Sequence, residues 1–181
     1  TGVLAGCILL YISHVFLNSF TLQIIRAKGG DSSHMGLSMA LAALSELPTM
    51  LLFTRMLRKK SSSFYMKLTG FFFLLKAVGS WLAPNVTVYY LFQLTQVGAW
   101  ALIAIASVYY VNAIMEPQDA VKGQAYFTSA YTLANVFGAL LGGRLIDTLG
   151  ITAMLLLGTV FAALGTAVNL IFAEKTVDKG I

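Results

Sequence analysis

Long runs of apolar residues, separated by short polar segments, dominate the chain. Six of these runs cover residues 3–25, 34–54, 64–82, 86–112, 122–145 and 151–172. Each approaches or exceeds the roughly 20 residues that a helix needs to cross a hydrocarbon core of about 30 Å. Apolar and polar residues do not alternate within the runs, which excludes the strands of a membrane barrel. The pattern therefore predicts an all-α membrane protein, with residues 1–181 forming one domain of six transmembrane helices.

Four of the six segments carry polar side chains at helical spacing, each forming a stripe down one face. The stripes comprise Tyr11, His14, Asn18 and Thr21; Ser38, Ser45, Glu46 and Thr49; Tyr89, Gln93, Gln96, Trp100 and Ser107; and Gln124, Thr128, Tyr131 and Asn135. The third and sixth segments are almost wholly apolar. We expect helices one, two, four and five to surround a hydrated or solute-filled space, with three and six outside it. Interhelical hydrogen bonding is the alternative interpretation of the same stripes.

Glu46 and Lys76 lie near the middle of the second and third segments. An ionised side chain at membrane depth costs several kcal/mol unless it is paired or hydrated, and such residues usually mark a solute or proton pathway. The alternative is a buried ion pair that locks the two helices together. At a rise of about 1.5 Å per residue, the two backbones would differ in depth by about 7 Å, which a lysine stem can partly bridge.

Several further residues admit more than one interpretation. His14, near the middle of the first segment, is either a hydrogen-bonded packing residue or a proton-coupling group. Tyr109 and Tyr110 lie near a helix end and are typical of the aromatic belt at a membrane interface. Gly138 and Gly142 have the spacing of a motif that lets two helices approach closely.

Composition agrees with the pattern, since 58% of the residues are hydrophobic and 10% are charged. The mean hydropathy is +0.80. A net charge of +5 does not indicate nucleic acid binding, because no basic surface with interleaved aromatics is present. Most basic residues fall in the loop 55–63 and in segments on the same side, whereas the opposite side carries Arg26, Lys28 and Arg144. The positive-inside rule then places both termini in the cytoplasm. The basic residues of that side are Arg55, Arg58, Lys59, Lys60, Lys67, Lys122, Lys175 and Lys179.

The chain offers little for other chemistry. Cys7 is the single cysteine, so a disulfide framework or thiolate metal site within one chain is excluded. His14 and His34 lie at different depths, and no nucleophile motif occurs, which argues against an intramembrane enzyme. We expect no cofactor and no metal. Because the sequence begins with Thr1 and enters an apolar run at once, we expect a fragment of a longer chain.

A faint internal repeat relates the first three segments to the last three. An offset of about 89 residues places Glu46 over Asn135 and Arg55 over Arg144. Because three is odd, the two triplets would have opposite topology in the membrane. Two inverted three-helix repeats are typical of secondary carriers.

Longer strings resemble the C-terminal six helices of the major facilitator superfamily, nearest the lactose-permease-like and phenylpropionate-permease-like proton symporters. The strings are SELPTMLLF at 45–53, RMLRKK at 55–60, LLKA at 74–77, GQAY at 123–126 and GALLGGRLIDTLG at 138–150. The resemblance implies that Glu46 helps to bind solute and that Lys76 works in the proton circuit. The histidine and carboxylate of the lactose permease's tenth helix are missing, and Gln93, Thr95, Gln96 and Gly98 occupy that region. Galactoside specificity and that proton pathway therefore do not carry over.

The expected function is that of half of a secondary active transporter in the cell (inner) membrane. It would move a small polar or aromatic solute, a sugar or an organic acid, by alternating access coupled to protons. Its partners would be lipid, solute, protons, and an N-terminal six-helix half of the same chain or a second copy. The expected solute and proton pathway comprises Glu46, Lys76, His14, Asn18, Gln93, Gln96, Trp100, Tyr131 and Asn135. The alternative is a non-transporting scaffold or receptor-like protein of the same fold.

Overall fold

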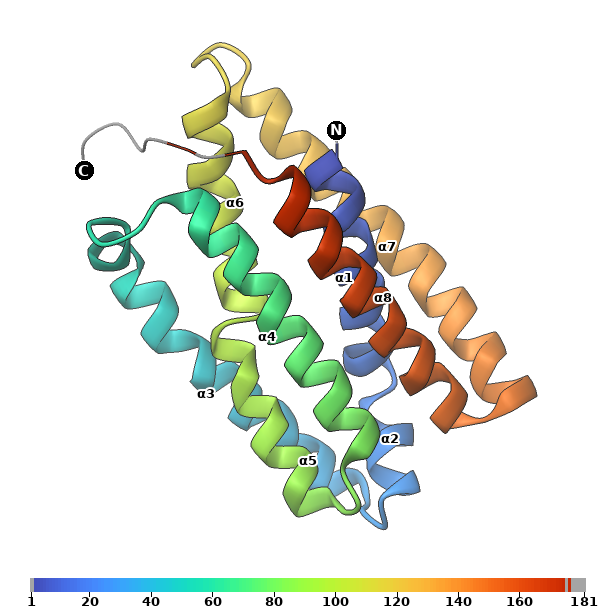
Figure 1. Cartoon of the computed structure of the whole chain (residues 1–181). Helices are drawn as coiled ribbons and strands as arrows, with labels where there is room; N and C mark the ends of the chain where they lie inside the picture. Colours follow the sequence, from blue (N-terminus) through green and yellow to red (C-terminus); the bar gives the residue numbers. More distant parts are fainter. Residues whose placement is uncertain (1, 175, 177–181) are drawn as a thin grey trace.

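The computed structural model describes residues 2–174 and 176, and helices make up nearly all of that part (Figure 1). The helices are α1 (Gly2–Ser19), α2 (Thr21–Ala27), α3 (Ser32–Leu57), α4 (Ser62–Leu82), α5 (Val86–Gln93), the 3₁₀ helix η1 (Leu94–Val97), α6 (Trp100–Ile114), α7 (Ala120–Leu149) and α8 (Ile151–Phe172). Lys175 and Lys179, which entered the charge argument, lie outside the described residues.

The predicted all-α class is confirmed for the described residues. Four segments are long and apolar enough to cross a membrane: Gly2–Ser19, Ser32–Leu57, Val86–Ile114 and Ile151–Phe172. The other two predicted segments, the third and the fifth, correspond to α4 and α7. Lys67 and Lys76 lie in α4, and polar residues and glycines are spread along α7. Six membrane crossings therefore remain a prediction.

Two predicted segments are broken, which corrects their description as continuous helices. The first stops at Ser19, and α2 starts at Thr21. The Thr21 hydroxyl donates to the carbonyls of Leu17 at 2.9 Å and Asn18 at 2.8 Å. A hydroxyl that bonds helix carbonyls in this way satisfies the backbone groups that a break exposes. The fourth segment passes from α5 through η1 to α6.

The turns are shorter than predicted. Helix α3 continues to Leu57, so Arg55 is helical and the basic loop narrows to residues 58–61. Helix α7 continues to Leu149, and only Gly150 separates it from α8. Gly150 has φ +83, a left-handed conformation that glycine adopts without a steric penalty.

Asp31 begins α3 as its N-cap. One carboxylate oxygen accepts from the backbone nitrogens of Ser33 at 2.9 Å and His34 at 3.2 Å. The Ser33 hydroxyl donates to the same oxygen at 2.6 Å. These hydrogen bonds hold the pKa of Asp31 below its usual range, and the bond from the Ser33 hydroxyl has the largest effect. The helix start is therefore fixed by a charged cap.

Glycines allow α1 to pack closely against two neighbours. A Cβ on Gly165 of α8 would lie 2.8 Å from the carbonyl oxygen of Gly6 on α1. On the α7 side, a Cβ on Gly138 would lie 3.0 Å from Val15 of α1, and one on Gly142 would lie 2.5 Å from Phe20. The Gly138 and Gly142 pair therefore faces α1, as expected of a close-packing motif.

Tyr110 is more buried than the sequence suggested. Its hydroxyl accepts from the backbone nitrogen of Glu174 at 3.2 Å, so its assignment to an interfacial belt is wrong. Asn169, near the end of α8, is likewise buried and lies beside Cys7. The position of a residue along a helix does not reveal which neighbours cover its side chain.

The helix ends fall into two groups (Figure 1). The N-terminus, the α3–α4 loop and the α6–α7 loop lie toward one end of the bundle, and the α2–α3 and α4–α5 loops lie toward the other. At the second end the Lys28 ammonium donates to the carbonyl of Ala83 at 2.6 Å. Burial lowers the pKa of Lys28. The figure also shows α3 on one flank of the bundle and α7 on the other, with α1, α4 and α8 between.

Candidate functional site

A cavity of about 210 Å³ lies among α1, α3, the η1–α6 region and α7. These are the four predicted segments that carry polar stripes. The cavity holds six of the nine residues predicted for the solute and proton pathway. Its lining comprises His14, Asn18, Met39, Ala42, Ala43, Glu46, Gln96, Trp100 and Tyr131.

Glu46, Gln96 and Lys76 form a hydrogen-bonded row at this cavity. The Gln96 amide nitrogen donates to the Glu46 carboxylate at 3.1 Å. The Lys76 ammonium donates to the Gln96 amide oxygen. The ion pairs among the described residues lie elsewhere, at His34–Asp31 and Lys122–Asp119. Glu46 and Lys76 therefore meet through Gln96 and not in the direct pair that the sequence allowed.

The three side chains of this row differ in how deeply they are buried. Lys76 is 2% exposed and Gln96 is 4% exposed, whereas Glu46 is partly exposed at the cavity. Lys76 does not line the cavity, because Gln96 lies between it and Glu46. A lysine removed from water needs a hydrogen-bond acceptor to offset its desolvation, and the Gln96 carbonyl provides one.

Two glycines bring α4 and the broken helix close enough for this row. A Cβ on Gly98 would collide with the ring of Phe72 on α4, and a Cβ on Gly79 of α4 would collide with the ring of Phe92 on α5. Each aromatic ring therefore occupies space that only a glycine leaves open. This reciprocal packing places Lys76 opposite Gln96.

Threonines of neighbouring helices bond two carbonyl groups at the break in the fourth segment, and the Ala99 carbonyl also accepts from the backbone nitrogen of Ile103 at 3.1 Å. The Thr49 hydroxyl of α3 donates to the Val97 carbonyl at 2.7 Å. The Thr69 hydroxyl of α4 donates to the Ala99 carbonyl at 2.8 Å. Irregular backbone at membrane depth persists only where it is buried in protein or lines a cavity, with its polar groups paired. These threonines therefore support the geometry that presents Gln96.

Aromatic rings form another wall of the cavity. His14 stacks on Trp100 with ring centroids 4.7 Å apart and an interplanar angle of 4°. The ring centroids of Tyr131 and Trp100 are 4.7 Å apart. Tyr11, which lies outside this lining, packs behind Tyr131 with ring centroids 5.3 Å apart. Among the described side chains, the His14 Nδ1 atom is buried with no hydrogen-bond partner. A flat aromatic face beside a carboxylate can accept the ring of a solute.

Three predicted site residues lie outside the cavity lining. Lys76 is behind Gln96, as described above. Gln93 is buried one turn away, near the Tyr89 hydroxyl. The Asn135 amide donates to the Tyr131 carbonyl of its own helix at 2.9 Å. The sequence missed Gly79, Gly98 and Thr69 as supporting residues, although a glycine in the middle of a predicted span is a signal of close backbone approach.

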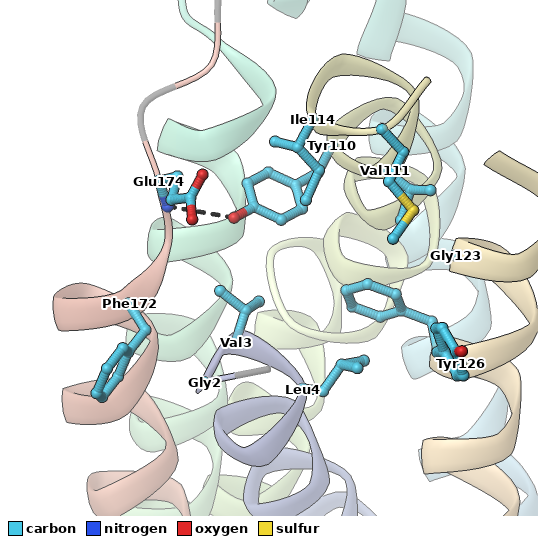
Figure 2. A pocket seen from close by; sticks show the side chains of 12 residues that line it. Gly2, Val3, Leu4, Tyr110, Val111, Ile114, Gly123, Tyr126, Phe172 and Glu174 are labelled. Carbon is cyan, nitrogen blue, oxygen red and sulfur yellow. Dashed lines mark hydrogen bonds between the residues drawn. The ribbon is translucent and has the colours of Figure 1, made fainter. Parts of the chain in front are cut away.

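Further cavities lie toward the end of the bundle that holds the N-terminus. One of about 230 Å³ shares Trp100 and Tyr131 with the Glu46 cavity. Another of about 310 Å³ lies among the ends of α1, α6, α7 and α8 (Figure 2). Its lining is mainly apolar, and Tyr110 and Glu174 supply polar groups there. Although this cavity is the larger of the two, Glu46 and the hydrogen-bonded row that joins it to Lys76 lie at the Glu46 cavity, which we take as the site.

The described residues offer no cluster of three or more histidine, cysteine, aspartate or glutamate side chains that could hold a metal ion. The chemistry of the site thus rests on one carboxylate, one amide, one buried ammonium and aromatic faces.

A bundle of apolar helices with buried charges around a polar cavity defines a helical membrane protein. The sequence profile of the MFS_1 like family matches residues 1–157, and the chain belongs to this family, which relates it to the major facilitator superfamily and to transporters. No curated protein matches the sequence.

Proposed function

We propose that the chain is the C-terminal half of a proton-coupled secondary carrier that works by alternating access. The observation that carries this proposal is Glu46, a carboxylate at membrane depth that faces a polar cavity and contacts Gln96. A membrane protein rarely keeps an ionisable group at that depth without a role in solute or proton movement.

The broken helices support a carrier with two inverted three-helix repeats. The breaks fall in the first and fourth predicted segments, which are the first members of the two triplets. Interrupted helices in corresponding positions of two repeats are typical of carrier binding sites. On this proposal α1 with α2, α3, α4, α5 with α6, α7 and α8 each cross the membrane, and both termini are cytoplasmic in the cell (inner) membrane.

A second six-helix half would complete the site. Helices α3 and α7 expose apolar side chains along most of their length, including Leu44, Leu51, Val136, Phe137 and Leu140. The Glu46 cavity lies between these two flanks and is bounded by one half only. We propose an N-terminal half of the same chain, or a second copy, as the opposite wall, with lipid around the assembly.

The residues that line the Glu46 cavity favour one of the two solute classes expected from the sequence, a sugar or an organic acid. Among the described residues, Glu46 is the only charged side chain that lines the cavity. A carboxylate accepts hydrogen bonds from hydroxyls and repels an anionic solute, while Trp100 and Tyr131 offer faces to a ring. The geometry therefore favours a neutral, hydroxylated ring such as a sugar over an organic acid.

A binding screen tests this proposal. The full-length protein, with and without each of a set of sugars, aromatic acids and nucleosides, is followed by thermal unfolding at two pH values. A bound solute raises the transition temperature by mass action. We expect stabilisation by a neutral ring solute, and transport of that solute by reconstituted vesicles. Binding without transport would favour the receptor-like alternative, and the absence of both would favour a scaffold.

The proposal includes no enzymatic activity. We expect a reactive-serine probe to leave the pure protein unlabelled. Covalent labelling by the probe would contradict this part of the proposal.

A further inference from the structure

We propose that Gln96 is the positioning residue that couples Glu46 to Lys76, through the donor and acceptor ends of a single amide. This inference deepens the proposed function, since it assigns the link between the two charges of that site. It rests on the row of hydrogen bonds from Lys76 through Gln96 to Glu46.

The chemistry of the three groups fixes the orientation of the amide. An ammonium can only donate hydrogen bonds, and an ionised carboxylate can only accept them. The Gln96 amide presents its oxygen to Lys76 and its nitrogen to Glu46, so each end meets a partner of the complementary kind. Turning the amide over would place two donors together at one end and two acceptors together at the other.

Burial makes the link sensitive to both charges. Gln96 is 4% exposed and Lys76 is 2% exposed, so water does not replace a lost partner at the Lys76 end. Successive hydrogen bonds polarise one another, most strongly away from water. The ammonium at the oxygen end therefore strengthens the bond that the nitrogen end donates to Glu46.

The Gln96 side chain is enclosed by neighbouring helices. Gln96 lies in η1, which packs against α3, α4, α5 and α6. The titratable members of the row are Glu46 of α3 and Lys76 of α4. The other titratable side chains at the same cavity are His14 of α1 and Tyr131 of α7. Among the described residues, no hydrogen bond joins His14 or the Tyr131 hydroxyl to the row.

Infrared spectroscopy of the reconstituted full-length protein tests the coupling without any solute. Subtracting the spectrum of Glu46→Gln isolates the carboxylate band of Glu46. We expect Gln96→Met, which keeps the chain length but removes both polar ends, to shift that band. We expect Gln96→His to keep the band near its original position, because a neutral imidazole also has one donor and one acceptor.

The decisive comparison adds Lys76→Met. If the charge acts through the amide, Lys76→Met shifts the Glu46 band when Gln96 is present and leaves it unmoved in the Gln96→Met background. An equal shift in both backgrounds would overturn the inference, since Lys76 would then act directly through space. An unmoved band in Gln96→Met would overturn it as well.

Folding controls keep the result interpretable. Gln96→Met alone leaves the buried Lys76 ammonium without its acceptor. The double variant with Lys76→Met removes both partners, so it should be at least as stable as the single Gln96→Met variant. Gln118→Met, at an exposed loop glutamine, is the matched control and should not move the band. A coupled band in a protein that transports nothing would defeat the proposed function and leave this inference intact. Proton-coupled transport by a protein whose Glu46 band does not respond to Lys76 through Gln96 would defeat this inference and leave the proposed function intact.

Discussion

At the scale of single residues, the site depends on which small side chains allow close packing. Lys76 reaches Gln96 because Gly98 and Gly79 leave room for the rings of Phe72 and Phe92. The polar residues supply the chemistry, and the glycines set the distance across which it acts.

Gly98→Ala tests this packing. The new Cβ would collide with the base of the Phe72 ring as well as its edge, so the whole ring would have to move. We expect the free energy of unfolding to fall by about 1–3 kcal/mol, the usual effect of overpacking a core. Thermal or denaturant unfolding of the purified protein measures the change.

Gly36→Ala is the matched control, because a Cβ there meets no atom within 4 Å. Alanine is the better helix former, so this variant should be neutral or slightly stabilising. An equal loss of stability in both variants would show that the packing around Gly98 has no special role.

At the scale of elements, the sequence predicted more than it missed. Hydrophobic runs located the helices, and helical spacing placed Glu46, Gln96, Trp100 and Tyr131 on stripes that meet at one cavity. The break at η1 was not predicted, because the side chains that bond its carbonyls, Thr49 and Thr69, lie on other helices. Contacts between segments remote in sequence do not appear in local periodicity. For the same reason, the bridging role of Gln96 and the burial of Tyr110 could not be foreseen.

The start of α3 gives a pH-dependent prediction. The folded state holds the pKa of Asp31 below its usual range, so its contribution to stability is present at neutral pH and is lost as pH falls through the folded pKa. We expect Asp31→Ala to speed amide hydrogen exchange several-fold in the first turn of α3 at neutral pH. The difference from the original protein should shrink well below about pH 4, the usual range for an aspartate.

Measurement of both proteins at each pH removes the intrinsic dependence of exchange on pH. A difference that stays constant down to strongly acidic solution would mean that the carboxylate charge of Asp31 does not stabilise this helix start.

At the scale of the whole molecule, the proposed function makes the described helices one wall of a carrier cavity. The Glu46 cavity is bounded by α1, α3, the η1–α6 region and α7, and the exposed apolar faces of α3 and α7 flank it. Alternating access requires two halves that move against each other around a shared site. The proposed second half is therefore as important to transport as the residues described here.

We expect residues 1–181 expressed alone to insert into membranes and to fail to accumulate solute. The full-length chain, reconstituted at the same density, is the control and should accumulate it. Uphill transport by residues 1–181 without any partner half would contradict the two-walled carrier, unless the chain is shown to pair with a second copy of itself.

The most direct test of the central claim, that Glu46 carries the proton-coupled step, is uphill solute accumulation by the full-length Glu46→Gln variant in vesicles under an imposed proton gradient. The substitution removes the ionisable group and keeps the size of the side chain. We predict an accumulation ratio of about one, because a carrier without its coupling group can only equilibrate the solute, while the thermal transition stays close to that of the original protein. Full uphill accumulation by a folded Glu46→Gln protein would remove Glu46 from the mechanism.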